Sequence, residues 1–211
     1  MIVPQTVNLT PQTGRFKARS YDGDYMKAGK IAEKVIIDWL TSHPDVIEVE
    51  DLRDVCEIQH TDMDITVRLR DGTHPLAEIK WDRHLGSTGK VLVEVLRLNH
   101  KAPTSVAGVL GWTLRTEARW ILYFAPRFGY VYQFQTDALR HCLQCYTDAV
   151  RADTEFTWIS TDRVKSTLCI LLPLTACVGA FTVHDVIEFT RPHLPAIDQY
   201  RLRFAPEPLQ W

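Results

Sequence analysis

The feature that most restricts the fold of this chain is a pair of alternating apolar segments separated by a turn signal. Between Asp62 and Arg70 the residues alternate between polar and apolar, which is the period of a half-buried β-strand. Asp71-Gly72, a favoured hairpin dipeptide, follows, and the extended pattern resumes over residues 75–81 (PLAEIKW). The sequence therefore predicts two antiparallel strands that lie side by side.

Three charged residues of this hairpin are candidates for chemistry. Asp64 belongs to the polar face of the first strand, and Glu78 and Lys80, two residues apart in the second, project from one face. Two carboxylates beside an ammonium suit a hard cation such as Mg²⁺, which proteins hold through one or two carboxylates, water and phosphate oxygens. Asp62 competes with Asp64 as the ligand. The alternative for Glu78 and Lys80 is an ion pair on an exposed strand.

The elements on either side of the hairpin indicate an α/β (α+β) chain. Apolar residues recur at helical spacing over Met26–Ser42, and His43-Pro44 ends this helix. A second long helix is predicted over Thr136–Ala149. Further strands are predicted at short apolar runs, namely within residues 46–59 and at residues 91–96, 120–124 and 130–134.

The rest of the chain is expected to complete one domain. Residues 84–90 (HLGSTGK) have the composition of a loop, and the apolar run Cys169–Phe181 predicts a buried strand and turn, because a proline and a glycine interrupt it. This run is also shorter than the roughly 20 residues that a membrane helix needs, so no membrane partner is expected. A helix is predicted around His184–Phe189. We expect a single domain over residues 25–211, after a polar N-terminal arm of residues 1–24.

The charge of the chain is nearly balanced. With 24 Lys and Arg against 26 Asp and Glu the net charge is −2 at pH 7, so any binding to nucleic acid must use local basic patches. Five basic residues stand against two acidic ones between Lys80 and Lys101. Within that segment Arg83, Lys90 and Lys101 are candidates for binding a phosphate backbone, with an ordinary solvated loop as the alternative. The absence of a Walker-A loop, a GxGxxG motif and a serine nucleophile elbow leaves nucleotide hydrolysis, dinucleotide chemistry and α/β-hydrolase chemistry without support.

The five cysteines are an odd number in a chain without a signal-peptide pattern. Reduced thiols and a cytoplasmic location are therefore expected. His141, Cys142 and Cys145 have the spacing of a metal half-site, but no second pair with suitable spacing accompanies them. We expect these cysteines to pack against the sheet as small apolar residues.

The hairpin motif resembles the signature of the PD-(D/E)XK, or restriction-endonuclease-like, nuclease superfamily. The D…(D/E)xK pattern of that superfamily is similar to two segments of this chain, TDMDITV and AEIK. The two acids of the pattern, Asp64 and Glu78, are fourteen residues apart. The downstream stretch is similar to phage and mobile-element members, with Lys90 in place of the usual Asn and with matches at Asp82, Thr88, Gly89, Glu94, Gly111, Ala118 and Trp120. The match spans about residues 29–134 and implies a core with a central mixed β-sheet flanked by helices.

The resemblance also implies a role for each site residue. Asp64, which directly precedes the apolar residues of its strand as in the family, and Glu78 would be metal ligands. Ile79 would add its backbone carbonyl, and Lys80 would be the catalytic lysine. Glu33 of the first helix would be an outer carboxylate, whereas the alternative for Glu33 is a solvated residue at the margin of that helix.

The activity implied by the resemblance is hydrolysis of DNA phosphodiester bonds by an endonuclease. The implied cofactor is Mg²⁺, for which Mn²⁺ can substitute. A noncatalytic nucleic-acid-binding or assembly subunit that retains the nuclease fold and an RNA-directed nuclease are the alternatives. The complete set of two acids and a lysine favours the enzyme, because a decayed copy is expected to lose at least one of them. A homodimer or another protein partner is left open.

Overall fold

The structure, a computed structural model, describes residues 24–53, 63–82, 85–99, 109–149, 156–160 and 165–193. The predicted N-terminal arm up to residue 23, and Asp62, lie outside the described residues. In chain order the elements are α1 (Asp24–Ser42), β1 (Val46–Asp51), β2 (Ile65–Leu69), β3 (Leu76–Trp81), α2 (Leu85–Thr88), β4 (Lys90–Asn99), β5 (Val109–Leu110), α3 (Trp112–Arg115), β6 (Trp120–Ala125), β7 (Tyr130–Gln135), α4 (Thr136–Ala149), β8 (Phe156–Ser160), β9 (Lys165–Pro173), η1 (Leu174–Cys177), β10 (Phe181–Asp185), α5 (Ile187–Thr190) and η2 (Arg191–His193).

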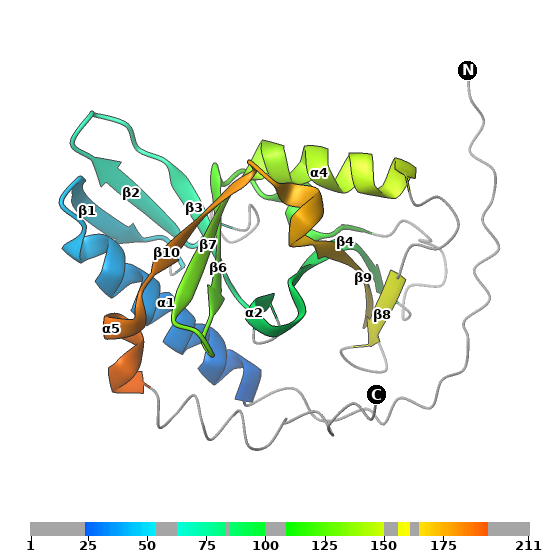
Figure 1. The fold of residues 1–211 in the computed structure, drawn as a ribbon, viewed down its shortest axis with the longest axis horizontal. Helices are drawn as coiled ribbons and strands as arrows, with labels where there is room; N and C mark the ends of the chain where they lie inside the picture. The colour runs from blue at the N-terminus through cyan, green and yellow to red at the C-terminus, as the bar shows by residue number, and fades with distance from the viewer. Residues whose placement is uncertain are drawn as a thin grey trace.

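The strands form two sheets (Figure 1). The larger sheet has the order β1-β2-β3-β6-β7-β10 and is mixed, because β3 and β6 are parallel whereas its other neighbours are antiparallel. The smaller sheet, β5-β4-β9-β8, is antiparallel throughout. The predicted α/β (α+β) class with a mixed sheet and flanking helices is confirmed, and the smaller sheet is an addition that the sequence did not predict.

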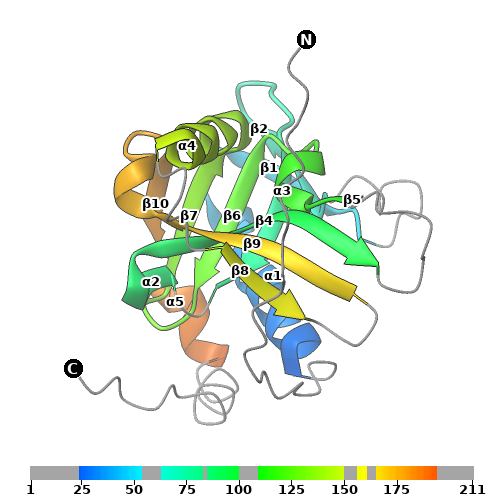
Figure 2. The same cartoon turned by 90° about the vertical axis from the view of Figure 1, so that its right-hand side faces the viewer.

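Helix α1 covers one face of the larger sheet, and α4 and the smaller sheet cover the other (Figures 1 and 2). On one face α1 packs through Val35 and Ile36 in an apolar cluster that includes Val67 and Leu122 of the strands. On the other face β4, β9 and α4 contribute to a second cluster that includes Tyr123. Strand β6 is thus covered on both faces, which accounts for its nearly continuous apolar sequence WILYFA.

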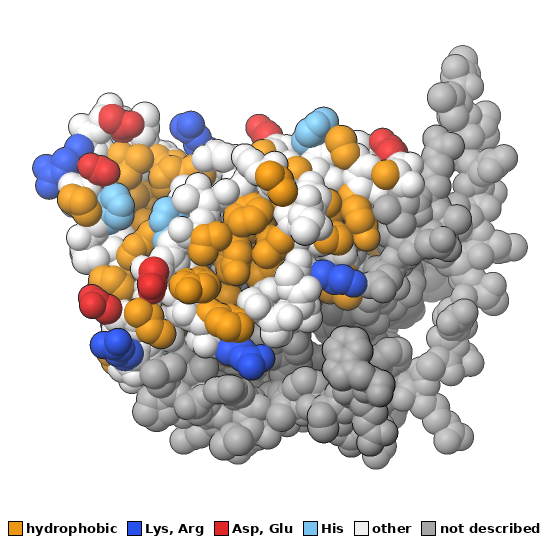
Figure 3. Space-filling model, in the orientation of Figure 1, with side chains coloured by type: hydrophobic (Ala, Val, Ile, Leu, Met, Phe, Trp, Pro, Cys, Tyr) orange, Lys and Arg blue, Asp and Glu red, His pale blue; other side chains and the backbone are white. Residues whose placement is uncertain are grey.

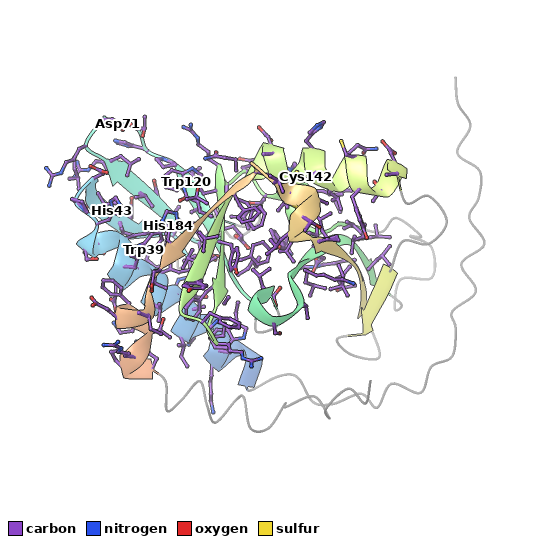
Figure 4. The ribbon with its side chains drawn as sticks, in the orientation of Figure 1. Trp39, His43, Asp71, Trp120, Cys142 and His184 are labelled. Carbon is purple, nitrogen blue, oxygen red and sulfur yellow. The ribbon has the colours of Figure 1, made fainter. Side chains whose placement is uncertain are left out.

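The predicted hairpin is formed by β2 and β3, and its turn is longer than the predicted dipeptide. Leu69 N–H donates to Thr73 O (2.9 Å), and Gly72 N–H donates to Leu69 O (3.1 Å). Gly72 has a φ of 84°, so the turn is a three-residue loop that ends in a left-handed glycine. Asp71 lies at the tip of the hairpin (Figure 4), where its Oδ1 accepts the N–H of Thr73 at 2.8 Å.

Residues 85–88 form the one-turn helix α2, where the sequence predicted a loop. Oδ1 of Asp82 accepts the N–H of Leu85 at 2.9 Å and so caps the start of the helix. Gly89 follows with a φ of 63°, and its N–H donates to Leu85 O at 3.0 Å, which ends the helix on a left-handed glycine. The prediction of a loop was wrong, because Asp82 caps the start of this turn and Gly89 ends it. A single turn is also too short to show helical periodicity in the sequence.

Strand β10 replaces the first part of the helix predicted over His184–Phe189, and only Ile187–Thr190 is α-helical. His184 pairs with Val131 of β7 in the ladder, and its Nε2 lies 2.8 Å from Oε1 of Gln133. The His184 ring also lies against Trp39 of α1, with 4.8 Å between the ring centroids (Figure 4). Pairing at the edge of the larger sheet therefore outweighs the local helical pattern.

The apolar run Cys169–Phe181 forms a strand and turn, as predicted. Strand β9 ends at Pro173, and the 3-10 helix η1 follows it. The side chains of Cys169, Ile170 and Leu172 are buried. No helix among the described residues is both long enough and apolar enough to cross a membrane.

Candidate active site

Strand β3 carries Glu78 and Lys80 to the face of the larger sheet that lies opposite α1. Ala77 and Ile79 belong to the apolar cluster of α1, and successive residues of a strand alternate between faces. Lys80 Nζ contacts Oε1 of Glu78, and the exposed fractions of the two side chains are 28% and 3%. We call Glu78 and Lys80 the β3 pair. Glu78 is buried and Lys80 is half-buried, so the pair differs from the exposed surface pair that was the alternative.

Asp64 joins the β3 pair from the start of β2. Its Oδ2 accepts the N–H of Ile79 at 2.6 Å. Burial raises the pKa of Asp64 above its usual value of 3.8. The Lys80 ammonium is the largest opposing effect on this pKa, followed by the hydrogen bond from Ile79 and the charge of Arg53. One ammonium therefore acts on two carboxylates, and the structure brings three of the predicted site residues together.

The peptide of Ile79 faces Asp64 because β2 and β3 pair over a short length only. The register ends at Ile65 and Ala77, and beyond this point the Asp64 side chain takes the N–H of Ile79. The N–H and the C=O of one strand residue project from the same edge of the strand, so the Ile79 carbonyl points toward the side of Asp64. A backbone metal ligand at Ile79 requires this orientation, and the ligand role itself stays a prediction.

Glu33 lies in a separate charged group. Its carboxylate pairs with Arg53, whose guanidinium also binds Asp51 through Nε and Oδ1 at 2.7 Å. The Glu33 side chain is 21% exposed, so it is not the solvated residue of the alternative. The sequence did not predict Arg53. The two-residue spacing of Asp51 and Arg53, which repeats that of the β3 pair, is the signal that could have found it.

The ring of Trp112 lies over Lys80, with 4.6 Å between Nζ and the ring centroid. Two residues of the downstream resemblance hold this ring in place. A Cβ at Gly111 would collide with the carbonyl oxygen of Glu94, and Oε1 of Glu94 lies 3.4 Å from Trp112 N. The ring also packs on Tyr123, at 6.1 Å between centroids. The sequence did not predict Trp112, although the match at the preceding Gly111 pointed to this position.

Asp82, which follows β3, contacts the backbone of β4. Besides capping α2, it places Oδ2 at 3.4 Å from the backbone N of Leu92. The hydroxyl of Tyr123 donates to Leu92 O at 2.9 Å. Burial and then the charge of Asp82 hold the pKa of Tyr123 well above its usual range. Tyr123 is therefore a neutral donor, and Asp82 supports the site through the backbone of β4.

The predicted phosphate-binding residues are only partly covered by the structure. Lys90 is the first residue of β4, pairs with Pro173 of β9 and has a half-exposed side chain. Arg83 and Lys101 lie outside the described residues. On the face of the molecule in Figure 3, described hydrophobic side chains gather over the middle, and the Lys and Arg side chains drawn there are scattered around them. The described part of that face thus carries no basic patch, in keeping with the balanced charge.

The residues present fit a magnesium site built on two carboxylates. Among the described residues no group of three or more His, Cys, Asp and Glu side chains is placed to hold a metal ion, and this includes His141 and Cys145, whose Nε2 and Sγ lie 3.6 Å apart on α4. Mg²⁺ keeps several waters and is often held by one or two carboxylates, so a third is not required. Asp64 and Glu78, largely buried and acted on by one ammonium, have the donor chemistry of such a site.

Comparison of the chain with protein-family models, with curated proteins and with solved structures found no match in any of the three. The resemblance to the PD-(D/E)XK nucleases therefore rests on the hairpin motif and on the segment downstream of it. The mixed larger sheet with flanking helices agrees with that resemblance at the level of fold class.

Proposed function

We propose that this chain is a divalent-metal-dependent nuclease that hydrolyses DNA phosphodiester bonds. The observation that carries the proposal is the β3 pair, with its buried carboxylate and half-buried ammonium, and Asp64 beside it. Taking charged groups out of water costs several kcal/mol for each ion, and apolar residues in such places are often at least as stabilising. A chain that keeps two carboxylates and an ammonium here gives up stability, as functional sites with perturbed pKa values commonly do.

Each residue of the site has a part in this reaction. Asp64 and Glu78 would hold Mg²⁺, or Mn²⁺ in its place, and the carbonyl of Ile79 would add a third oxygen. When bound, the ion would stabilise charge on the phosphoryl oxygens and lower the pKa of the attacking water. Lys80 presents three donors at Nζ, which can bind a nonbridging phosphate oxygen or hold the attacking water.

Trp112 restricts where the Lys80 ammonium can lie. The carboxylate of Glu78 contacts Nζ, and the Trp112 ring lies over it. A free lysine side chain samples many rotamers, so this confinement lowers the entropic cost of placing the charge against a phosphate. The substrate class, DNA, is supported by the resemblance, and the excess of five basic over two acidic residues between Lys80 and Lys101 in the sequence is in keeping with it.

A cleavage assay on supercoiled plasmid, linear duplex, single-stranded and branched DNA, with RNA in parallel, tests the proposal. We expect DNA to be cut in Mg²⁺ or Mn²⁺ and not in EDTA. Lys80→Met and Asp64→Asn are expected to lower the rate by about 100-fold or more, since each removes a group that acts on developing charge. Arg68→Met is the matched control, because it removes an exposed ion pair with Glu48 between β1 and β2.

Three outcomes would contradict the proposal. Equal rates for wild type and Lys80→Met would place the chemistry elsewhere. DNA binding without cleavage in every metal would favour the noncatalytic subunit. Cleavage of RNA alone would replace DNA as the substrate.

A further inference from the structure

A second charged group lies beside the candidate active site. It consists of Glu33 from α1, Asp51 at the end of β1, and Arg53 two residues later, and we call it the Arg53 group. Asp51 pairs in the β1–β2 ladder with Ile65, whose side chain is buried in the apolar cluster of α1. Paired residues of a ladder project from the same face. The Arg53 group therefore lies on the α1 side of the sheet, opposite to the side of the β3 pair.

Both acids of this group hold the guanidinium of Arg53. Its Nη1 contacts Glu33, its Nη2 contacts Asp51, and its Nε donates to Asp51 Oδ1 at 2.7 Å. The backbone N–H of Arg53 donates to the same oxygen at 3.1 Å. A guanidinium is planar, offers five donors and stays protonated in proteins. A permanent positive charge is thus fixed against the Glu33 carboxylate.

The same charge acts on Asp64. The N–H of Leu52 donates to Asp64 O at 2.9 Å, so the chain runs beside Asp64 up to the residue before Arg53. The charge of Arg53 opposes the rise in the pKa of Asp64, whereas that of Asp51 adds to it. Arg53 therefore interacts with Glu33 by contact and with Asp64 through space. A second divalent ion bound between the Arg53 group and Asp64 would need the carboxylates of Glu33 and Asp64.

We propose that Arg53 takes the place of a second divalent ion, so that the site binds one ion, at Asp64 and Glu78. Two-metal phosphodiesterase sites hold their ions about 3.5–4 Å apart. A dication placed against Glu33 would meet the guanidinium of Arg53, which already contacts that carboxylate and is held in place by Asp51. This inference rests on the proposed function. It changes the role of Glu33 from an outer metal ligand to an anchor for Arg53.

The number of Mn²⁺ ions bound to the full chain tests this, by electron paramagnetic resonance of the free ion and by calorimetry. Wild type is expected to bind one ion. Arg53→Met leaves Glu33 and Asp51 near Asp64 without their cation and is expected to bind two. Arg53→Lys retains the positive charge and is expected to bind one ion. The double variant Glu33→Gln/Arg53→Met lacks the Glu33 carboxylate that a second ion would need, so it is also expected to bind one. The matched control, Arg68→Met, removes an arginine from an exposed pair and is also expected to bind one.

Two ions in wild type, or one ion in Arg53→Met with a native circular dichroism spectrum, would overturn the inference. Arg53→Gln, which keeps donors and loses the charge, serves as a second variant if Arg53→Met does not fold. Asp64→Asn separates this inference from the proposed function. If wild type binds no Mn²⁺, or Asp64→Asn binds as many ions as wild type, the metal site itself is wrong. If Asp64→Asn loses binding and Arg53→Met still binds one ion, only the role of Arg53 is wrong.

Discussion

Lys80 is held by two contacts of different kinds. The Glu78 carboxylate balances its charge, and the Trp112 ring offers an aromatic face to Nζ at 4.6 Å. Removal of the carboxylate would leave the half-buried charge of Lys80 without this partner, which is destabilising. Removal of the ring would leave the charge balanced and the ammonium free to move. The two contacts can therefore be separated by experiment.

Trp112→Leu is expected to lower kcat about tenfold with little change in KM, because a partly buried cation–π contact is worth about 1–2 kcal/mol and about 1.4 kcal/mol is a factor of ten. Trp112→Phe keeps an aromatic face and is expected to stay within about threefold of wild type. Steady-state cleavage of DNA in Mg²⁺ measures both variants. In a Lys80→Met background Trp112→Leu should cause no further loss. An equal loss in both backgrounds would mean that Trp112 acts through the fold alone.

Strand alternation predicted the site residues that share one backbone segment. Glu78 and Lys80 could be placed together because a two-residue spacing determines a shared face. Arg53 and Trp112 could not be placed in the same way, because each meets its partner across elements. Arg53 reaches Glu33 on α1, and the Trp112 ring of α3 reaches Lys80 on β3. Such contacts follow from tertiary packing, which a local pattern does not contain.

Among the elements, long periodic helices were predicted and single turns were not. Helix α4 has the predicted bounds, and α1 begins at Asp24 rather than Met26. Each buries one face against a sheet, and that face is visible as a 3.6-residue period. The smaller sheet was missed because Lys90 of β4 pairs with Pro173 of β9, a partner far away in the sequence. Alternation predicts a strand but does not identify the strand that pairs with it.

The junction of β5 and α3, which packs against β4, requires a glycine. A Cβ on Gly111 would collide with the Glu94 carbonyl, and the N–H of Gly111 is bound to Val95 O at 2.9 Å, so the backbone cannot retreat without losing this bond. Gly111→Ala is expected to lower the free energy of unfolding by about 1–3 kcal/mol, as overpacking does. It should also lower activity, because Trp112 would shift from its place over Lys80. Urea denaturation and the cleavage assay measure the two effects.

Gly29→Ala is the control for this substitution. Gly29 lies within α1, and the nearest heavy atom to a Cβ there would be Glu33 Oε1 at 4.0 Å. Alanine stabilises a helix interior by up to about 1 kcal/mol relative to glycine, so a neutral or positive change is expected. A Gly111→Ala variant as stable as wild type would show that the β5–α3 junction can relax and does not fix Trp112.

For the molecule as a whole, the larger sheet separates two charged groups as well as two apolar clusters. The α1 side holds the Arg53 group, and the side of β4 and α4 holds the β3 pair. Asp64 lies where β2 and β3 stop pairing and is acted on by charges of both groups. Ionised side chains at this place are partly withdrawn from water, so the stability of the entire fold depends on their protonation.

The sign of this dependence follows from the pKa of Asp64. Burial raises that pKa above 3.8, so the native state binds the Asp64 proton more tightly than the unfolded chain does. The unfolded chain therefore loses this proton first as the pH rises. The contribution of Asp64 to stability is greatest below about pH 4 and is lost as the pH rises through the native pKa.

Asp64→Asn removes the ionised form and is expected to melt above wild type at pH 7 in EDTA, with the difference disappearing near pH 4. For a chain of this size each kcal/mol corresponds to about 2–4 °C in Tm. Mg²⁺ is expected to raise the Tm of wild type, because it binds the native state, and to leave the variant unchanged. Thermal melts of both proteins at pH 7 and near pH 4, with and without Mg²⁺, measure the differences in Tm between them and the effect of Mg²⁺ on each. A variant that melts below wild type at pH 7 in EDTA would show that the ionised carboxylate stabilises the fold through Lys80 and Ile79 more than its burial costs.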